Sequence, residues 1–292
     1  MKILVTGSTG LLGGALVGLL LEEGHEVRSL VRAESLRAAR LDPLRVELVR
    51  GDAGDVRALS EALSGADAFL HVAGIEYAPQ VVEAAQRTGV GRLVVVGSTS
   101  AHSAYEFRSS PKLRMEELVR GSGLEYTIVR PSMIYGSELD MNMHRLLRFL
   151  DRSPVFPVFG SGENLWQPVY HEDCARGLYE ALVRPAAIRQ SYDLPGAEPL
   201  TYLELVRTAA GALGRKPRIV RLPLEPVRLA LAAAERLPLP LPVRSEQVLR
   251  LKEDKAYPYD KAKRDLGYAP RSFREGIELE VARLRELGMV RP

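Results

Sequence analysis

The sequence predicts an α/β fold: a doubly wound parallel sheet, followed by a smaller and mostly helical lobe. In the first half of the chain, short apolar runs alternate with segments of helical periodicity, which is typical of βαβ units. A glycine-rich turn lies between the first apolar run and the first helical segment. Near residue 150 the alternating pattern ends, and proline, glycine and aromatic residues become frequent. We therefore expect a sheet domain over residues 1–150, to which later segments can return, and a second lobe over residues 151–292.

Six strands are predicted in the first domain, the number in a full doubly wound sheet. The first is the buried run Lys2–Thr6, and the leucines of the helix after it share one face until Gly24 ends that helix. The other strands are expected at Glu26–Val31, Val46–Val49, Ala68–Val72, Leu93–Val96 and Tyr126–Val129. Helices are expected at Val56–Leu63, Val81–Thr88 and Lys112–Arg120.

The second half predicts fewer regular elements. A helix is expected at Glu172–Val183 and a short strand at Tyr192–Leu194. Thr201 and Glu204 have the spacing of a capping box, which predicts a helix from there to about Leu213. Phe273–Leu287 has the periodicity of a last amphipathic helix.

The composition excludes several classes of protein. With 46% hydrophobic residues the chain can bury a large core, so global disorder is excluded. The formal charge is only +3, and no aromatic–basic cluster occurs, so we expect no nucleic-acid partner. Cys174 has no second cysteine to pair with, which indicates a reducing, cytoplasmic setting.

The sequence also lacks the patterns of a membrane-spanning helix and of a metal site. The most apolar stretch, residues 227–242, is interrupted by charges and prolines. It is also shorter than the roughly 20 residues of a membrane-spanning helix, so we expect no membrane span. The five histidines show no metal-ligand spacing, so no metal site is predicted. A small-molecule substrate remains the expected partner, and the helices carry no pattern that decides the oligomeric state.

The glycine-rich turn predicts a phosphate-binding loop. Glycines at a strand-to-helix turn let the backbone approach a pyrophosphate closely, and the following helix presents unpaired N–H groups to it. The strand before the loop, the helix after it and the further βα units supply the context that this motif requires. The predicted phosphate-binding residues are Gly7, Ser8, Thr9, Gly10, Leu11, Leu12 and Gly13.

The loop has the spacing Gly-x-x-Gly-x-x-Gly, and several motifs follow it in order. They are Gly51-Asp52, His71-Val72-Ala73-Gly74, Thr127 to Pro131 with Tyr135-Gly136, Gln167 to Asp173, and Asp260 to Gly267. Together they resemble the short-chain dehydrogenase/reductase superfamily in its extended or atypical branch, which is epimerase/dehydratase-like. The resemblance spans nearly the whole chain and implies a Rossmann domain that binds a nicotinamide dinucleotide. It also implies that Asp52 accepts a hydrogen bond from the adenine amino group.

The resemblance also assigns cofactor-binding positions beyond the phosphate loop. They are Arg32, Gly51, Asp52, Ala53, His71, Val72, Ala73, Gly74, Ser98, Lys112, Arg130, Pro131, Ser132 and Met133. His71 is also expected to pack at the end of its strand, close to the path of the cofactor.

The end of the second strand bears on the choice of cofactor. NAD-dependent relatives place an acid there for the adenosine ribose hydroxyls, whereas this chain has Val31 followed by Arg32. A guanidinium can form a charge-assisted fork with a 2′-phosphate. We therefore predict NADP(H) in preference to NAD(H), the alternative being that Arg32 and Arg28 are ordinary solvated arginines.

The catalytic group that the resemblance implies is incomplete. Members of the superfamily generally use a Tyr–Lys pair, four residues apart on one helical face, with a nearby Ser or Thr. Thr99, beside Ser98, lies where the hydroxyl residue belongs, and Lys112 lies where the lysine belongs. The residue four positions before Lys112 is Arg108, not tyrosine, and we expect Pro111 to prevent one continuous helix from Tyr105 to Lys112.

Three interpretations of the proton donor stay open. Tyr105 reaches in from a loop, Tyr135 substitutes for it, or the chain binds cofactor without classical reduction. The first two predict an oxidoreductase or epimerase-like enzyme that acts on a small carbonyl or hydroxyl compound. The third predicts an accessory or redox-sensor protein, similar to the nucleotide-binding accessory subunit group of respiratory complex I.

The substrate is expected in a cleft beyond the carboxyl ends of the strands. Ser132, Met133, Tyr135 and Trp166 are candidate substrate contacts, with packing as the alternative role. Arg215, Lys216, Arg218 and Arg221 could contact a diphosphate or form ordinary surface charge.

Overall fold

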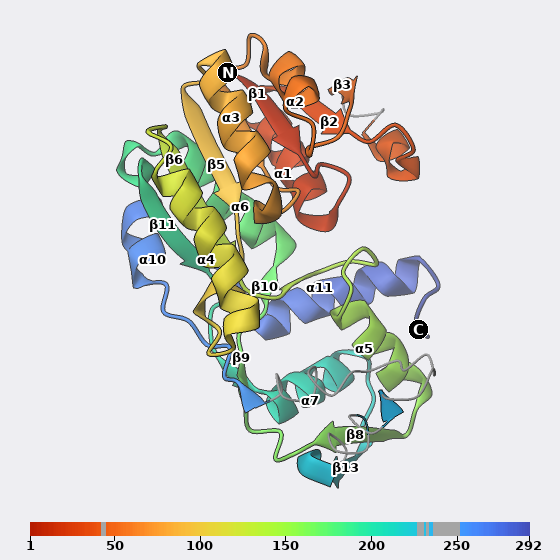
Figure 1. The fold of residues 1–292 in the computed structure, drawn as a ribbon. Coiled ribbons are helices and arrows are strands. Elements are labelled where there is room, and N and C mark those ends of the chain that lie inside the picture. Colours follow the sequence, from red (N-terminus) through yellow and green to blue (C-terminus); the bar gives the residue numbers. More distant parts are fainter. Residues whose placement is uncertain (42–44, 227–230, 232–233, 236–251) are drawn as a thin grey trace. The chain divides into compact units, whose positions relative to one another are not determined.

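The computed structural model describes residues 1–41, 45–226, 231, 234–235 and 252–292, and they form two compact units (Figure 1). The first, which we call the sheet unit, comprises Met1–Ile134, Val169–Pro195 and Pro258–Pro270. The second unit comprises Tyr135–Pro168, Gly196–Tyr257 and Arg271–Pro292. The chain thus leaves the sheet unit after Ile134, earlier than the expected boundary at residue 150, and returns to it twice. The apolar stretch 227–242 lies almost entirely outside the described residues.

The sheet unit contains a seven-stranded sheet whose paired strands are all parallel, in the order β11-β6-β5-β4-β1-β2-β3. The strands are β1 (Lys2–Thr6), β2 (Glu26–Val31), β3 (Glu47–Arg50), β4 (Ala68–His71), β5 (Arg92–Val96), β6 (Tyr126–Pro131) and β11 (Gln190–Leu194). The doubly wound fold is confirmed, but the expected count of six strands is wrong. The seventh strand was predicted only as a short strand at Tyr192–Leu194. It is an edge strand whose buried residues alternate, so it lacks the continuous apolar run of its neighbours.

Helices cover both faces of this sheet. On one face, α1 (Leu11–Glu22), α6 (His171–Val183) and α10 (Asp260–Leu266) share a core with Ile3 and Val5 of β1. On the other face, α2 (Val56–Leu63), α3 (Ala78–Thr88) and α4 (Glu106–Arg120) pack with Leu4 of the same strand. Alternate residues of one strand therefore belong to opposite cores, as a sheet buried on both faces requires.

The helix α4 begins at Glu106 and continues through Pro111 to Arg120, so the expectation that Pro111 interrupts it is wrong. Proline removes one backbone donor, and here the lost bond lies close to the start of the helix. Tyr105 is the N-cap, and its carbonyl oxygen accepts from the backbone N–H of Arg108 at 2.9 Å and of Ser109 at 3.2 Å. Tyr105, Arg108 and Lys112 consequently follow one face of a single helix, at i, i+3 and i+7.

Short elements lie between these helices and strands along the chain. They are the 3₁₀ turns η1 (Leu36–Arg40), η3 (Ile75–Tyr77), η4 (Thr99–His102) and η5 (Pro185–Ala187), and the two-residue strands β7 (Ile134–Tyr135) and β10 (Val169–Tyr170). Of the helices that the structure describes, none is long and apolar enough to cross a bilayer.

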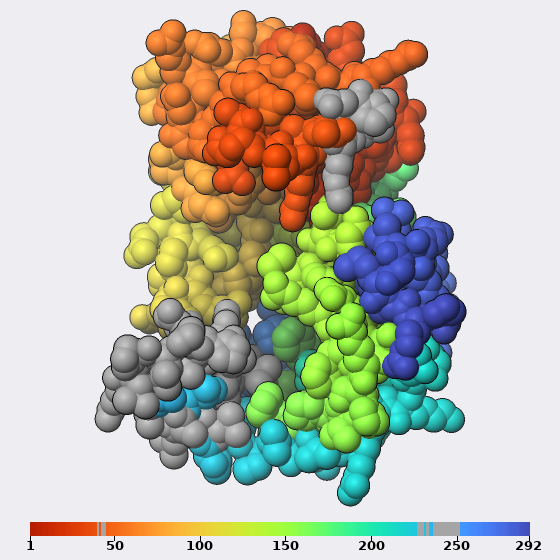
Figure 2. Space-filling view, turned by 90° about the vertical axis from the view of Figure 1, so that its right-hand side faces the viewer, coloured from red at the N-terminus to blue at the C-terminus, as the bar shows by residue number. Residues whose placement is uncertain are grey.

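The second unit is built mainly on three helices, α5 (Met143–Arg152), α7 (Tyr202–Ala212) and α11 (Phe273–Glu286). Strands β8 (Val155–Phe159) and β13 (Arg218–Leu222) pair in parallel, and β9 (Leu165–Trp166) pairs antiparallel with β12 (Leu200–Thr201). Figure 2 shows α11, in blue, beside the green segment that includes α5, and the two helices are in contact.

Capping boxes define the starts of two helices in the second unit, and a buried ion pair joins three of its segments. The predicted capping box of Thr201 and Glu204 is confirmed at the start of α7, and Ser272 and Glu275 form a second one at α11. The carboxylate of Asp151 is almost fully buried and pairs with Arg215 at 3.0 Å and with Arg291 at 3.2 Å. Arg215 is thus engaged inside the unit, which leaves three of the four basic residues considered for a diphosphate exposed.

Candidate functional site

Two cavities open at the carboxyl ends of the strands of the sheet unit, one after β1, β2, β3 and β4 and the other after β1, β4, β5 and β6. One has a volume of about 370 Å³ and the other of about 340 Å³. Gly7, Gly10 and Val72 line both of them, so the glycine loop forms a common wall. We call the first the Arg32 cavity and the second the Ser98 cavity.

The three glycines of the loop have different reasons to be glycine. Gly7 has φ +75°, and a Cβ there would lie 2.8 Å from the backbone nitrogen of Ala73. A Cβ at Gly13 would overlap the carbonyl oxygen of Gly7. Gly10, by contrast, has ordinary φ, and its Cβ would meet only the Gly7 oxygen, at 3.4 Å. The fold therefore requires Gly7 and Gly13, whereas the small size of Gly10 keeps space open in the cavities.

The helix that follows the loop offers unoccupied donors to this space. Gly10 is the N-cap of α1, so no side chain caps the helix, and Leu11, Leu12 and Gly13 line the Ser98 cavity. An uncapped first turn presents backbone N–H groups and the positive end of the helix dipole. The residues present therefore fit a pyrophosphate.

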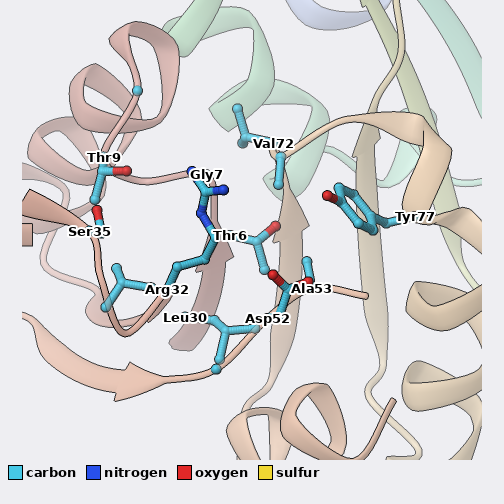
Figure 3. A pocket seen from close by; sticks show the side chains of 14 residues that line it. Thr6, Gly7, Thr9, Leu30, Arg32, Ser35, Asp52, Ala53, Val72 and Tyr77 are labelled. Carbon is cyan, nitrogen blue, oxygen red and sulfur yellow. The ribbon is translucent and has the colours of Figure 1, made fainter. Parts of the chain in front are cut away.

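The Arg32 cavity has the residues expected around an adenosine. Figure 3 shows the side chain of Arg32 reaching across it toward Gly7, with Asp52 and Ala53 at the opposite wall. Asp52 Oδ1 accepts from the Gly54 N–H at 2.7 Å, which fixes the turn, so its predicted role toward adenine and its role in the turn are compatible. Among the described residues, none forms an ion pair or hydrogen bond with the Arg32 guanidinium.

Several residues that line this cavity were not predicted as cofactor contacts, among them Ser35 and Tyr77. Ser35 lies three residues beyond Arg32, and Tyr77 belongs to η3, and both line the Arg32 cavity. In Figure 3 the hydroxyl groups of Thr9 and Ser35 lie on the same side of the cavity, and the Tyr77 hydroxyl points into it. The sequence signal for Ser35 was its place just after the strand end, whereas nothing local distinguishes Tyr77.

His71 supports the cavities without lining either of them. It is fully buried, its Nδ1 lies 2.8 Å from the Thr6 hydroxyl, and its Nε2 lies 2.7 Å from the Gly74 carbonyl oxygen. Since a carbonyl only accepts, Nε2 carries the proton and Nδ1 accepts from Thr6. Burial lowers the pKa of His71 to about 4, so the ring is neutral and fixes the loop that presents Val72 and Ala73 to the cavities.

We expect the protein to lose stability as the pH falls below about 6.5 because of His71. The unfolded histidine, with an ordinary pKa near 6.5, binds protons that the folded one refuses down to about pH 4, so stability decreases as the pH falls through this window. The loss between pH 7 and pH 5 should be about 2 kcal/mol. Urea unfolding at both pH values should show it in the wild type and show less of it in His71→Gln. An equal pH dependence in both proteins would contradict the assignment.

The Ser98 cavity is lined by residues from the ends of β5 and β6. They are Val96, Gly97, Ser98, Pro131, Ser132 and Ile134, with the glycine-loop residues and Val72. Ser98 caps η4 by accepting from the Ser100 N–H at 3.2 Å. Thr99, the predicted hydroxyl residue, is buried beneath and donates to the Pro131 carbonyl oxygen at 3.4 Å. Ser98, rather than Thr99, is therefore the hydroxyl residue at the wall.

Other predicted site residues lie outside both cavity walls. Ser8 is buried, and Gly74, Arg130, Met133, Lys112 and Tyr105 do not line either cavity. Lys112 is half-buried on α4. Tyr135 is buried within the second unit, where its hydroxyl donates to the Phe273 carbonyl oxygen at 3.4 Å, and it lines neither cavity. Trp166 lies under the ammonium of Lys255, which is 3.8 Å from the ring centre.

A chain of charged groups runs along the α4 face of the sheet, next to the Ser98 cavity. Glu116 is fully buried and accepts from Arg130 through both carboxylate oxygens, at 2.6 and 2.5 Å. Arg130 also lies 3.4 Å from Asp193 of β11, and Asp193 accepts from His102 Nε2 at 2.9 Å. Sequence reasoning singled out Arg130 but not its pairing with Glu116 of α4 and Asp193 of β11, because these two partners come from separate segments of the chain.

The fold and the two cavities define a protein that binds a nicotinamide dinucleotide. The model of a family described as NAD(P)H-binding matches residues 7–143. The chain is 33% identical to a ceramide reductase of Caulobacter vibrioides over 76% of its own length and 73% of that protein. It is 29% identical to a 2-alkyl-3-oxoalkanoate reductase of Stenotrophomonas maltophilia, over 95% of this chain and 97% of the other.

Solved structures agree. The crystal structure of gox2253 superposes with a TM-score of 0.81 at 26% identity and covers 99% of both chains. The UDP-glucuronic acid 4-epimerase of Bacillus cereus, in complex with NAD, gives 0.77 at 20% identity over 98% of this chain and 99% of that one. The chain belongs to the short-chain dehydrogenase/reductase superfamily, in its extended, epimerase/dehydratase-like branch.

Proposed function

We propose that this chain is an NADP(H)-dependent reductase of a carbonyl compound that carries an alkyl chain. The observation that carries the cofactor preference is Arg32, whose guanidinium stands in the Arg32 cavity while Val31, where an acid would bind the ribose, is apolar and buried. A charge without a described partner in such a cavity suits a phosphate. Thr9 and Ser35 add two hydroxyl donors to the same cavity wall.

The proposed reaction rests on the relatives. The names of two of them describe reductases whose substrates, a ceramide and a 2-alkyl-3-oxoalkanoate, have alkyl chains. When bound, the reduced nicotinamide supplies the hydride. The chain's own residues hold the cofactor: Gly10 and the first turn of α1 at the pyrophosphate, Asp52 at the adenine, and Ser98, Pro131 and Ser132 at the nicotinamide end.

An Arg32→Asp variant should reverse the cofactor preference. Loss of the charge-assisted fork and repulsion of the 2′-phosphate should weaken NADPH binding on the order of 10- to 100-fold, while NADH binding stays equal or improves. Calorimetric titration with NADPH, NADP, NADH and NAD in parallel measures this. Arg37→Asp is the matched control, because Arg37 is exposed on the same segment and does not line the cavity. Tighter binding of NADH than NADPH by the wild type would contradict the preference.

Turnover tests the second half of the proposal. With NADPH in excess and a 2-alkyl-3-oxoalkanoate as the probe, the wild type should oxidise one NADPH for each molecule of alcohol that it forms. Tight cofactor binding without turnover of this probe or of a panel of alkyl ketones would sink the reductase proposal.

One observation favours a second candidate function. Arg108 occupies the place on α4 where the superfamily has its tyrosine, and the continuous helix puts it on the same face as Lys112. An accessory or redox-sensor protein would bind the cofactor tightly, without turnover, and with different affinities for its oxidised and reduced forms. The four-way titration distinguishes this candidate by comparing NADPH with NADP.

A further inference from the structure

We infer that Glu280 of α11 and Asp140 share one proton, and that this acid–carboxylate pair joins the segment before α5 to α11. Loss of the proton at alkaline pH leaves two negative charges in a buried place and destabilises the second unit. The two residues belong to separate parts of that unit, Tyr135–Pro168 and Arg271–Pro292. Neither lines a cavity, so the pair is a pH-sensitive device apart from the cofactor site.

The Glu280 carboxyl is buried beside another carboxyl. Its side chain is fully buried, and neither of its oxygens has a hydrogen bond of ordinary length and angle. The groups that act on it are the Asp140 carboxyl and the backbone N–H of Gly136. Two carboxylates offer only acceptors, so one member needs a proton to bond to the other. Burial and the neighbouring Asp140 raise the pKa of Glu280 to about 10, which makes Glu280 the acid near neutral pH.

Asp140 has the surroundings of the charged member. Its Oδ1 accepts from the backbone N–H of Asn142 at 2.9 Å and of His144 at 3.1 Å, at the start of α5. Backbone donors and the positive end of a helix dipole stabilise a negative charge. The other oxygen, Oδ2, is buried, and no described group donates to it. It is therefore the atom that can accept the proton of Glu280.

Other charged groups lie on the elements packed against α11. They are Glu138 before α5, His144, Arg148 and Asp151 on α5, and the exposed Glu204 and Arg207 on α7. Glu138 pairs with Arg283 of α11 at 3.5 Å, and His144 Nδ1 lies 3.5 Å from Asp140 Oδ1. The charged group that acts on the Glu280 carboxyl is Asp140. A negative charge on Glu280 would therefore be repelled where it forms.

The shared proton gives the unfolding reaction a definite pH dependence. In the unfolded chain Glu280 ionises with its ordinary pKa near 4.5, whereas the folded protein keeps the proton up to about pH 10. Between these values unfolding releases one proton, so stability falls as the pH rises. The unfolding equilibrium constant should increase by up to about tenfold for each pH unit.

The test compares urea unfolding of the wild type and Glu280→Gln at pH 7 and pH 9. Glutamine keeps a donor for Asp140 and an acceptor for Gly136 but has no proton to release. From pH 7 to pH 9 the unfolding constant of the wild type should rise up to about 100-fold more than that of the variant. This range lies above the window in which His71 changes stability. The matched control is Glu278→Gln, exposed on the same helix, which should keep the pH dependence of the wild type.

A second measurement observes the proton directly. In protein labelled with carbon-13 at the glutamate carboxyl groups, NMR at pH 7 should show one signal of a protonated carboxyl that is absent from Glu280→Gln. Equal pH dependence of unfolding in the wild type and Glu280→Gln would overturn the inference. A Glu280 signal of an ionised carboxylate at pH 7 would overturn it too, even if the variant failed to fold. Neither measurement uses a cofactor or a substrate, so neither result bears on the proposed function.

Discussion

Gly13→Ala should lose about 3 kcal/mol of folding stability, whereas Gly10→Ala should fold normally and bind its cofactor more weakly. At Gly13 the added methyl group overlaps the Gly7 carbonyl oxygen, a backbone atom that cannot move without opening the loop. At Gly10 the methyl group has room in the protein but occupies the space where the pyrophosphate would lie against the helix.

The measurements are urea unfolding and NADPH titration of both variants. Gly10→Ala should bind NADPH at least roughly tenfold more weakly. Gly18→Ala is the control within the same helix, since a Cβ there has no neighbour within 4 Å. It should gain up to about 1 kcal/mol from helix propensity alone. Equal cofactor affinity of Gly10→Ala and the wild type would show that the pyrophosphate does not use this loop.

Glu116→Ala should destabilise the sheet unit by about 3–5 kcal/mol, because it leaves the Arg130 guanidinium in a buried position without its bidentate partner. The Glu116 carboxylate is fully buried and also accepts from Arg120 at 2.8 Å. The neighbouring Glu117 is exposed, so Glu117→Ala provides a control that should change stability by less than about 0.5 kcal/mol.

A double substitution separates the charge from the packing. Replacing Glu116 and Arg130 together by methionine removes both buried charges and keeps similar volume, so it should recover part of the stability that Glu116→Ala loses. Equal loss in the single and double variants, measured by urea unfolding, would show that packing, not the stranded charge, is responsible.

Much of the fold could be predicted from the sequence because its signals are local. Strands such as Lys2–Thr6 are continuous apolar runs, and the helix Val56–Leu63 was predicted with the bounds that the structure shows. The strand β11 and the start of α4 were harder. The edge strand β11 has buried residues only at alternate positions, so it lacks a continuous apolar run. In α4, the free energy that one proline near the helix start costs is smaller than the free energy that the packing of the whole helix contributes.

In the candidate site, too, the residues with local sequence signals were predicted and those that depend on tertiary contacts were not. Its glycine loop, Arg32 and Asp52 are consecutive with strand ends and line the cavities as residues near the motif should. The residues that were missed depend on tertiary contacts. Asp193 meets His102 only because β11, from a late segment of the chain, is added to the sheet beside β6, and no local pattern announces that pairing.

The assembly of the sheet unit from three segments has a consequence for its synthesis. The helices α6 and α10 and the strand β11, which complete one core, follow more than a hundred residues after β1. When the ribosome has made only the first 150 residues, α1 and the short η1 are, among the described helices that share the core of Ile3 and Val5, the ones already present. The nascent chain therefore carries an open apolar sheet face and an unpaired β6 edge until α6 and β11 emerge, and α10 joins the same core later still. The interval before β11 emerges is when a chaperone would matter most.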